Sequence, residues 1–291
     1  MQSGVSSYSF NQAIQDGRIT QYEAIDIAAR MGFASMDFSV LILQDESPAE
    51  AAAKLRKRAA DAGVQVANYA VSADFLRDGV DATVEQLKRE LDTAAELDAK
   101  VFRHDATAGY RKNSGKLIPF SDALPVLADG YRRVTEYGAT LGIRTTIENH
   151  GHYTQDSERI LALILEVGHY NFGSLLDIGN FACADEDSVA AVARLAPYAF
   201  HVHAKDFHTK PASVPSPGLG WFPTRSGAHL RGAIIGHGDI PIAPCLRMIQ
   251  AAGYDGVVAI EFEGIEDCLM AIEEGKRNLD GYIARHASSI S

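Results

Sequence analysis

The sequence has little of what marks several classes of protein. Its three cysteines, Cys183, Cys245 and Cys268, are far apart and form no CxxC pair, which argues against a disulfide framework and a thiolate zinc site and favours a reducing compartment. No stretch approaches the ~20 apolar residues of a membrane span, and the N-terminus lacks the basic start of a secretory signal. We therefore expect a soluble, cytoplasmic protein without a membrane partner.

Basic charge is also scarce. The formal net charge is -11, and no run of five or more lysines and arginines occurs. Because proteins that bind nucleic acid or anionic membranes usually present a basic face, this balance argues against both partners. No GxGxxG follows the first predicted strand, so a dinucleotide-binding fold lacks its main signature.

What is present is a regular alternation of short β-prone runs and longer amphipathic segments. We predict strands over residues 4–9, 35–40, 64–71, 101–104, 144–148, 173–177, 199–203 and 256–262. We predict helices over residues 20–31, 48–62, 82–97, 121–141, 157–167 and 242–252, several of which end at a glycine. This alternation predicts an α/β protein, a single (β/α)8 TIM barrel domain over residues 1–291.

The connection after the seventh predicted strand is unusually long. Residues 207–241 are rich in Gly, Pro and His and contain the only tryptophan, Trp221. A loop this long is usually functional or disordered. Its place after the seventh strand puts it on the C-terminal face of the barrel, where barrel enzymes bind their substrates.

The last four predicted strands each finish in a residue that can bind a metal. These residues are Glu148 in TTIENHG, Asp177 in LLDIGNF, His203 in HVHAKD and Glu261 in AIEFEG. Side chains at successive strand ends converge, and three carboxylates with one imidazole suit Mn²⁺, with Co²⁺, Mg²⁺ and Zn²⁺ as alternatives. One acidic residue at a strand end is more often a loop cap or an ion-pair partner. Four in succession favour a site for one divalent ion, which makes burial of Asp177 tolerable.

The ordered set of motifs is more specific than any one of them. IEN at 147–149, LDIGN at 176–180, HAKD at 203–206 and IEFEG at 260–264 resemble the xylose isomerase-like barrel superfamily of sugar phosphate isomerases and epimerases, and GHGDI at 236–240 is similar to its glycine-rich turn. The resemblance implies that Glu148, Asp177, His203 and Glu261 bind the divalent ion. It also implies that the two glutamates lie on opposite faces of the substrate. One removes the proton next to a carbonyl and the other returns it, while the metal stabilises the enediolate.

The sequence departs from two branches of that superfamily. Asn180 stands where the ketose 3-epimerase branch has a histidine, and an asparagine donates a hydrogen bond but does not titrate near neutrality. The additional histidines of the apurinic endonuclease branch are absent from predicted strands two and three and from the segment before Gly236. With the acidic net charge, this argues against DNA repair.

Several other polar residues are candidates for the site. His104 is a candidate catalytic base, and a hydrogen-bonded structural histidine fits its position equally well. His201 is expected to point away from the barrel axis in a structural role. Lys205 is a candidate for contact with the substrate, and a structural ion pair with Asp206 is the alternative. His150 and His237 are candidates too, with a solvated loop as the alternative for His150 and the geometry of a glycine turn as that for His237. The candidate substrate-binding residues are Asn180, Lys205, His150, Trp221 and His237.

The leading hypothesis is a divalent-metal-dependent sugar isomerase or epimerase that acts on a small carbohydrate. The alternative is a metal-dependent lyase, either a dehydratase or an enzyme of β-elimination from a 3-oxo-glycoside, for which the long segment forms a wall and His104 is a base. A non-catalytic sugar-binding or partner subunit is the third option, and it predicts that one or more of the four ligands are absent. We expect a homo-oligomer, dimer or tetramer, or a complex with another subunit.

Overall fold

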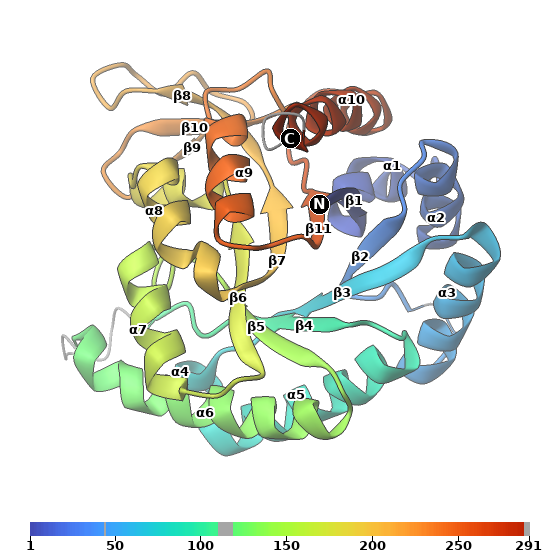
Figure 1. The fold of residues 1–291 in the computed structure, drawn as a ribbon, viewed down its shortest axis with the longest axis vertical. Coiled ribbons are helices and arrows are strands. Elements are labelled where there is room, and N and C mark those ends of the chain that lie inside the picture. The colour runs from blue at the N-terminus through green and yellow to red at the C-terminus, as the bar shows by residue number, and fades with distance from the viewer. Residues whose placement is uncertain (44, 110–118, 288–291) are drawn as a thin grey trace.

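Eight parallel strands close into a barrel in the computed structural model, which describes residues 1–43, 45–109 and 119–287 (Figure 1). Around the barrel the strand order is β1-β11-β7-β6-β5-β4-β3-β2. The predicted TIM barrel is therefore confirmed. The strands are β1 (Gln2–Ser6), β2 (Ser35–Ser39), β3 (Gln65–Val71), β4 (Val101–His104), β5 (Arg144–Glu148), β6 (Phe172–Asp177), β7 (Ala199–Ala204) and β11 (Val257–Ile260).

Helices form the outer layer of the barrel (Figure 1). They are α1 (Asn11–Gln15), α2 (Gln21–Arg30), α3 (Pro48–Ala62), α4 (Phe75–Asp78), α5 (Val80–Glu96), α6 (Phe120–Thr140), α7 (Ser157–Val167), α8 (Ser188–Leu195), α9 (Ile242–Ala251) and α10 (Cys268–Ala287). A capping box begins α2, since the Thr20 side chain accepts from the backbone N–H of Glu23 and the Glu23 carboxylate accepts from that of Thr20. Sequence reasoning missed α8, which has only eight residues, and α10, whose pattern is interrupted by Gly275 and Gly281.

Two strands at the closure of the barrel are shorter than predicted. The first ends at Ser6, because a 3₁₀ turn over Ser7–Phe10 replaces the expected continuation to residue 9. The last ends at Ile260, so Glu261 lies just beyond it. Residues that follow these two strands, including Tyr8 and Glu261, line a cavity of the barrel.

The segment after β7 contains a small three-stranded sheet, which the prediction of a long loop did not include. Its strands β8 (Asp206–Lys210), β9 (Phe222–Pro223) and β10 (His229–Ala233) pair in the order β8-β10-β9. The Asp185 side chain ties this sheet to the barrel by accepting hydrogen bonds from Thr224 Oγ1 at 2.6 Å and Ser226 Oγ at 2.8 Å. The segment therefore forms a fixed wall beside the mouth of the barrel.

The glycine-rich turn GHGDI closes against the end of β7. Asp206 accepts backbone N–H groups from Gly236 at 2.8 Å, Gly238 at 3.0 Å and Ile240 at 3.1 Å. A Cβ at position 238 would lie 2.2 Å from Asp206 Oδ1, so only glycine fits there. Asp206 is thus occupied by this turn, and the expected alternative of a Lys205–Asp206 ion pair is wrong.

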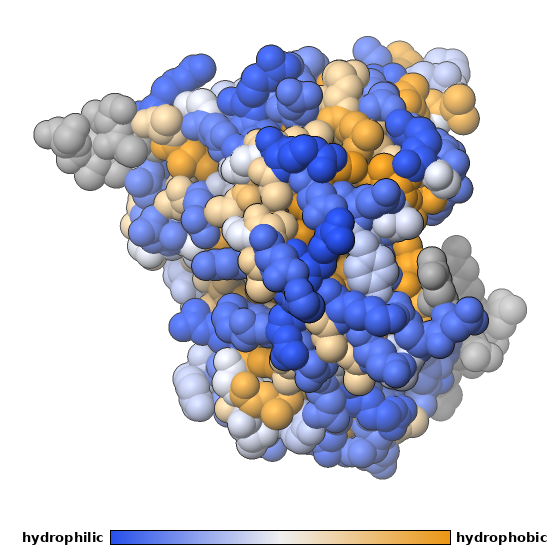
Figure 2. All heavy atoms as spheres, turned by 90° about the vertical axis from the view of Figure 1, so that its right-hand side faces the viewer, coloured by the Kyte–Doolittle hydropathy of each residue, from blue (hydrophilic) through white to orange (hydrophobic). Residues whose placement is uncertain are grey.

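Apolar side chains fill the space between the strands and the helices, including Phe38, Phe102, Tyr131 and Leu246. The face over α2 and α3 is covered mostly by hydrophilic side chains, with hydrophobic ones scattered between them (Figure 2). Among the described residues, no helix is both long and apolar enough to cross a membrane. Cys183, Cys245 and Cys268 are buried free thiols, in agreement with the expectation of no disulfides.

Candidate metal centre and active site

The four predicted ligands come together at the C-terminal ends of their strands. Glu148 ends β5, Asp177 ends β6, His203 lies near the end of β7 and Glu261 follows β11. Each offers one ligand atom, and these atoms all lie within 4.8 Å of one another. The convergence expected from successive strand ends is therefore present.

Local hydrogen bonds orient the Asp177 carboxylate. Its Oδ1 accepts the backbone N–H groups of Gly179 at 2.8 Å and Asn180 at 2.9 Å. Its Oδ2 is buried, has no hydrogen-bond partner among the described residues and faces Lys205 Nζ at 3.4 Å. Burial and the nearby carboxylates raise the pKa of Asp177 to about 6, so the isolated carboxylate is poorly accommodated.

His203 presents the second free ligand atom. Its Nδ1 is buried without a hydrogen-bond partner among the described residues, 3.6 Å from Glu261 Oε1 and 3.9 Å from Glu148 Oε1. Burial opposes a charge on this ring, yet Glu261 and Asp37 raise its pKa well above the ordinary value. The carboxylates thus favour a positive charge at this point. A divalent ion would satisfy both Nδ1 of His203 and Oδ2 of Asp177, so the residues fit a metal centre.

Lys205 and Asn180 flank this cluster. Lys205 is buried, and its Nζ lies 2.7 Å from Glu261 Oε2 and 3.2 Å from Asn180 Oδ1. The Asn180 amide donates to Glu148 Oε1 at 3.2 Å. Burial alone would raise the pKa of Glu261, but Lys205 and His203 hold it well below its usual range. Both predicted substrate contacts therefore lie beside the two glutamates.

Arg103, which sequence reasoning did not single out, fixes the other oxygen of Glu148. Its Nε lies 2.7 Å from Glu148 Oε2, and its Nη2 donates to Asp105 Oδ1 at 2.7 Å. Asp105 in turn contacts Nδ1 of the exposed His150 at 2.9 Å. Burial would lower the pKa of Arg103, but Glu148 and Asp105 raise it, so the guanidinium stays charged. Glu148 is thereby held with Oε1 toward the other three candidate metal ligands.

A cavity of about 360 Å³ opens onto the cluster. This volume is near the lower end of the ~300–1,000 Å³ typical of small-molecule sites. Its lining residues include Arg103, Glu148, His150, His203, Lys205 and Glu261. An adjoining recess is bounded by Asn180, His152 and Phe222, the last from the sheet that follows β7.

Comparison with known proteins agrees with this geometry. The family model described as xylose isomerase-like TIM barrel matches residues 25–281. The chain belongs to the xylose isomerase-like TIM barrel family. An inosose dehydratase of Geobacillus thermodenitrificans is 26% identical over 261 residues, which cover 85% of this chain and 83% of that protein.

Solved structures share the barrel of this family. One is L-ribulose 3-epimerase, with a TM-score of 0.75, 17% identity and coverage of 99% of this chain and 96% of that one. Another is the IOLI protein with a binding zinc atom, with a TM-score of 0.76, 14% identity and coverage of 98% and 99%. An epimerase and a protein that binds zinc thus share the fold of this chain, and a dehydratase is similar to it in sequence.

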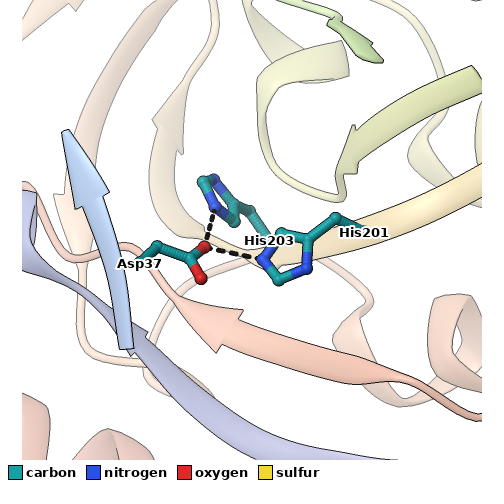
Figure 3. Close-up of side chains that lie close together, drawn as sticks. All are labelled: Asp37, His201 and His203. Atoms are coloured by element: carbon teal, nitrogen blue, oxygen red, sulfur yellow. Dashed lines mark hydrogen bonds and ion pairs between the residues drawn. The ribbon is translucent and has the colours of Figure 1, made fainter. Parts of the chain in front are cut away.

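His201 does not point away from the axis of this xylose isomerase-like barrel, so that expectation is wrong. Residues i and i+2 of a strand face the same side, which places His201 in the interior beside His203. Both rings contact Asp37 Oδ2 through Nε2, at 2.6 Å for His201 and 2.9 Å for His203 (Figure 3). Asp37, on β2, was missed by sequence reasoning because its partners lie more than 160 residues away. It leaves Nδ1 of His203 as the nitrogen available to a metal.

Replacing Asp37 with asparagine is expected to weaken Mn²⁺ binding by about 10–100-fold, the usual effect of losing a residue that orients a metal ligand. The substitution removes the negative charge that both rings contact through one oxygen. Isothermal titration calorimetry of the metal-free protein measures the change. His201→Gln is the matched control, since it keeps a donor beside Asp37 and should change affinity less than about threefold. An Asp37→Asn affinity equal to that of the control would contradict the role of Asp37.

His104 is not brought to the site, which contradicts its candidacy as a catalytic base. It is fully buried and stacks on Tyr131, with ring centroids 4.2 Å apart, and Nδ1 lies 2.9 Å from the backbone oxygen of Asp105. In β4 it is the preceding residue, Arg103, that lines the cavity. The structural alternative stated for His104 is the one that the contacts support.

Burial lowers the pKa of His104 to about 4, which predicts a pH dependence of stability. The unfolded chain, with an ordinary histidine pKa near 6.5, binds a proton that the folded protein excludes. The free energy of unfolding should therefore fall by up to roughly 3 kcal/mol as the pH drops from about 6.5 to 4. Urea titrations of His104→Gln should show this loss reduced, whereas the exposed-residue control His237→Gln should retain it. If the free energy of unfolding falls equally with decreasing pH in wild type and in His104→Gln, His104 is not the cause of the loss.

The remaining candidates divide between the cavity and the surface. His150 lines the cavity and contacts Asp105, as a pocket residue would. Trp221 lies half-buried, with the Arg231 guanidinium 5.7 Å from its ring centroid, and His237 is exposed. Neither is among the residues that line the main cavity or the adjoining recess. The described geometry therefore gives no support to a substrate contact by either one.

Proposed function

We propose that this protein is a divalent-metal-dependent sugar isomerase or epimerase that removes a proton next to the carbonyl of a polyhydroxylated substrate. The observation that carries the proposal is the cluster of Glu148, Asp177, His203 and Glu261, in which two buried ligand atoms lack hydrogen-bond partners among the described residues. We propose Mn²⁺ as the ion, because oxygen ligands predominate and one imidazole is present. All four ligands are present, which disfavours a binding subunit with a relic site.

Glu148 and Glu261 are the proposed acid–base pair. They come from β5 and from the end of β11, which are separated in the barrel by β6 and β7. One glutamate removes the proton next to the carbonyl, and the other returns a proton to the opposite face. A bound divalent ion supplies the Lewis acidity that stabilises the negative charge formed on the adjacent oxygen.

Three neighbouring residues prepare the site for this reaction. Arg103 holds Glu148 through Oε2, so that Oε1 remains directed at the cluster. Lys205 and Asn180 are positioned to hydrogen-bond substrate oxygens near the glutamates. Because these groups are buried and already oriented, little reorganisation accompanies proton transfer.

A dehydratase is the second candidate, for which two observations speak. The inosose dehydratase relative matches over most of both chains. Lys205 contacts Glu261 at 2.7 Å, so an ammonium group stands beside the carboxylate and can assist the departure of a hydroxyl group. Elimination and epimerisation share the first proton transfer and differ in the fate of the β-substituent.

Proton exchange in D₂O tests the proposal. Mn²⁺-loaded protein is incubated separately with ketohexoses, an inosose and 3-oxo-glycosides, and NMR follows deuterium at the carbon next to the carbonyl. Deuterium with a new epimer or isomer supports the leading proposal. Deuterium with loss of water, or with a released aglycone, supports the lyase. Absence of exchange with every carbonyl substrate would overturn both.

A further inference from the structure

The lining of the active-site cavity includes a side-chain amide that has no hydrogen-bond partner in the described part of the chain. Asn68 lies on β3, paired in register with Asp37 on β2, and both residues line the cavity. Asn68 is fully buried, and neither its Nδ2 nor its Oδ1 has a hydrogen-bond partner among the described residues. Asp37 Oδ1 is also buried and has no hydrogen-bond partner within residues 1–43, 45–109 and 119–287, because the contacts of Asp37 with the two histidines use Oδ2.

Such a group is costly in a folded protein unless something satisfies it. A buried amide loses its hydrogen bonds to water on folding, so nearly all such groups have partners in native structures. Asn149 is as deeply buried as Asn68, and its amide has the hydrogen-bond partners that are usual for such a group. Its Nδ2 donates to the backbone oxygen of Asp177 at 2.9 Å, and its Oδ1 accepts the Asp177 N–H at 3.0 Å. Asn68 differs in that it lines the cavity and that its amide atoms have no hydrogen-bond partner among the described residues.

We propose that Asn68, together with Oδ1 of Asp37, binds a hydroxyl group of the substrate at a carbon beyond those that react. Nδ2 of Asn68 donates to the hydroxyl oxygen, and an oxygen of Asn68 or Asp37 accepts the hydroxyl proton. Asn68 and Oδ1 of Asp37 offer one amide donor and two oxygen acceptors but no basic group, so together they suit a hydroxyl group of an unphosphorylated polyol better than a phosphate. This inference rests on the proposed function, which determines which carbons of the substrate react.

A buried structural water is the competing explanation, and stability separates the two. If the Asn68 amide has no hydrogen-bond partner until a ligand binds, metal-free Asn68→Leu should melt at or above the melting temperature of the wild type. The reason is that the substitution replaces an unsatisfied amide with an apolar group of similar size. Asn149→Leu, which breaks two hydrogen bonds, is the matched control and should melt lower. A fall for Asn68→Leu equal to that of Asn149→Leu would overturn the proposal. Failure of both Asn68→Leu and Asn68→Ala to fold would overturn it as well.

Ligand binding supplies the second measurement. myo-Inositol and sorbitol have no carbonyl, so their binding does not depend on the proposed chemistry. Calorimetry with Mn²⁺-loaded protein should show at least one of them binding about tenfold more weakly to Asn68→Leu than to wild type. A tenfold change in affinity is what the loss of about one hydrogen bond to the ligand is expected to cause. Equal affinities, or no binding of either polyol to the wild type, would overturn the subsite.

The two proposals fail separately. Polyol binding that depends on Asn68, in a protein that exchanges no proton of any carbonyl substrate, would contradict the proposed function and support the subsite. For an active enzyme, wild type should discriminate by tenfold or more between a ketohexose and one of its 4-, 5- or 6-deoxy analogues, and Asn68→Leu should abolish that discrimination. Discrimination retained in Asn68→Leu would overturn the subsite while leaving the enolising function supported.

Discussion

Asp177→Ala is expected to lose its divalent ion and, with it, at least about a thousandfold in activity. Lewis-acid stabilisation is worth several kcal/mol, and each 1.36 kcal/mol corresponds to about tenfold in rate. Asp177 supplies a buried oxygen that has no hydrogen-bond partner among the described residues, whereas its other oxygen already accepts two backbone N–H groups. Metal content is measured by elemental analysis after dialysis against Mn²⁺, and activity by proton exchange in D₂O.

Stability gives the same variant an independent readout. Wild type should be stabilised by added Mn²⁺, by about 2.7 kcal/mol at a metal concentration a hundredfold above the dissociation constant, and Asp177→Ala should not respond. Asp187→Asn is a suitable control, because Asp187 caps α8 by accepting from Ala190 and lies outside the cluster. Full metal occupancy in both Asp177→Ala and Glu261→Ala would refute the metal centre.

The barrel and the four converging ligands were predictable because each depends on local sequence. A βα repeat shows in hydrophobic periodicity and in glycine stops, and a carboxylate or histidine at the end of a predicted strand stands out. Glu148, Asp177, His203 and Glu261 all follow this rule, and the structure brings them together.

The errors arose where a residue's side of a strand or its distant partner decided its role. Strands buried on both faces read as continuous runs, so the sequence does not say which residue of such a strand faces the axis. His104 was therefore chosen at the end of β4, although Arg103 is the residue that reaches Glu148. Asp37 and Asn68 gave no local signal. The role of Asp37 follows from contacts with histidines that barrel closure brings to it, and that of Asn68 from amide atoms without hydrogen-bond partners among the described residues.

Glutamine substitutions at the two glutamates are expected to lower turnover by about 10²–10⁴-fold each, the range for losing a general acid or base. Because a glutamine oxygen can still bind the ion weakly, Mn²⁺ occupancy is measured in each variant and kept saturated. If the enzyme is an epimerase with two bases, Glu148→Gln and Glu261→Gln should each retain deuterium exchange in one epimer and lose it in the other. The reason is that the remaining glutamate can still remove and return a proton on its own face.

A dehydratase predicts a different division between the same variants. One substitution should stop both exchange and loss of water, because the base is missing, while the other should permit exchange and block only the departure of the hydroxyl group. Glu263→Gln is the matched control. Its carboxylate lines the same cavity and lies 3.7 Å from Lys205 Nζ but does not belong to the metal cluster, so kcat should change less than about tenfold. Full turnover in either Glu148→Gln or Glu261→Gln at saturating metal would remove that glutamate from the reaction and, with it, the two-base mechanism.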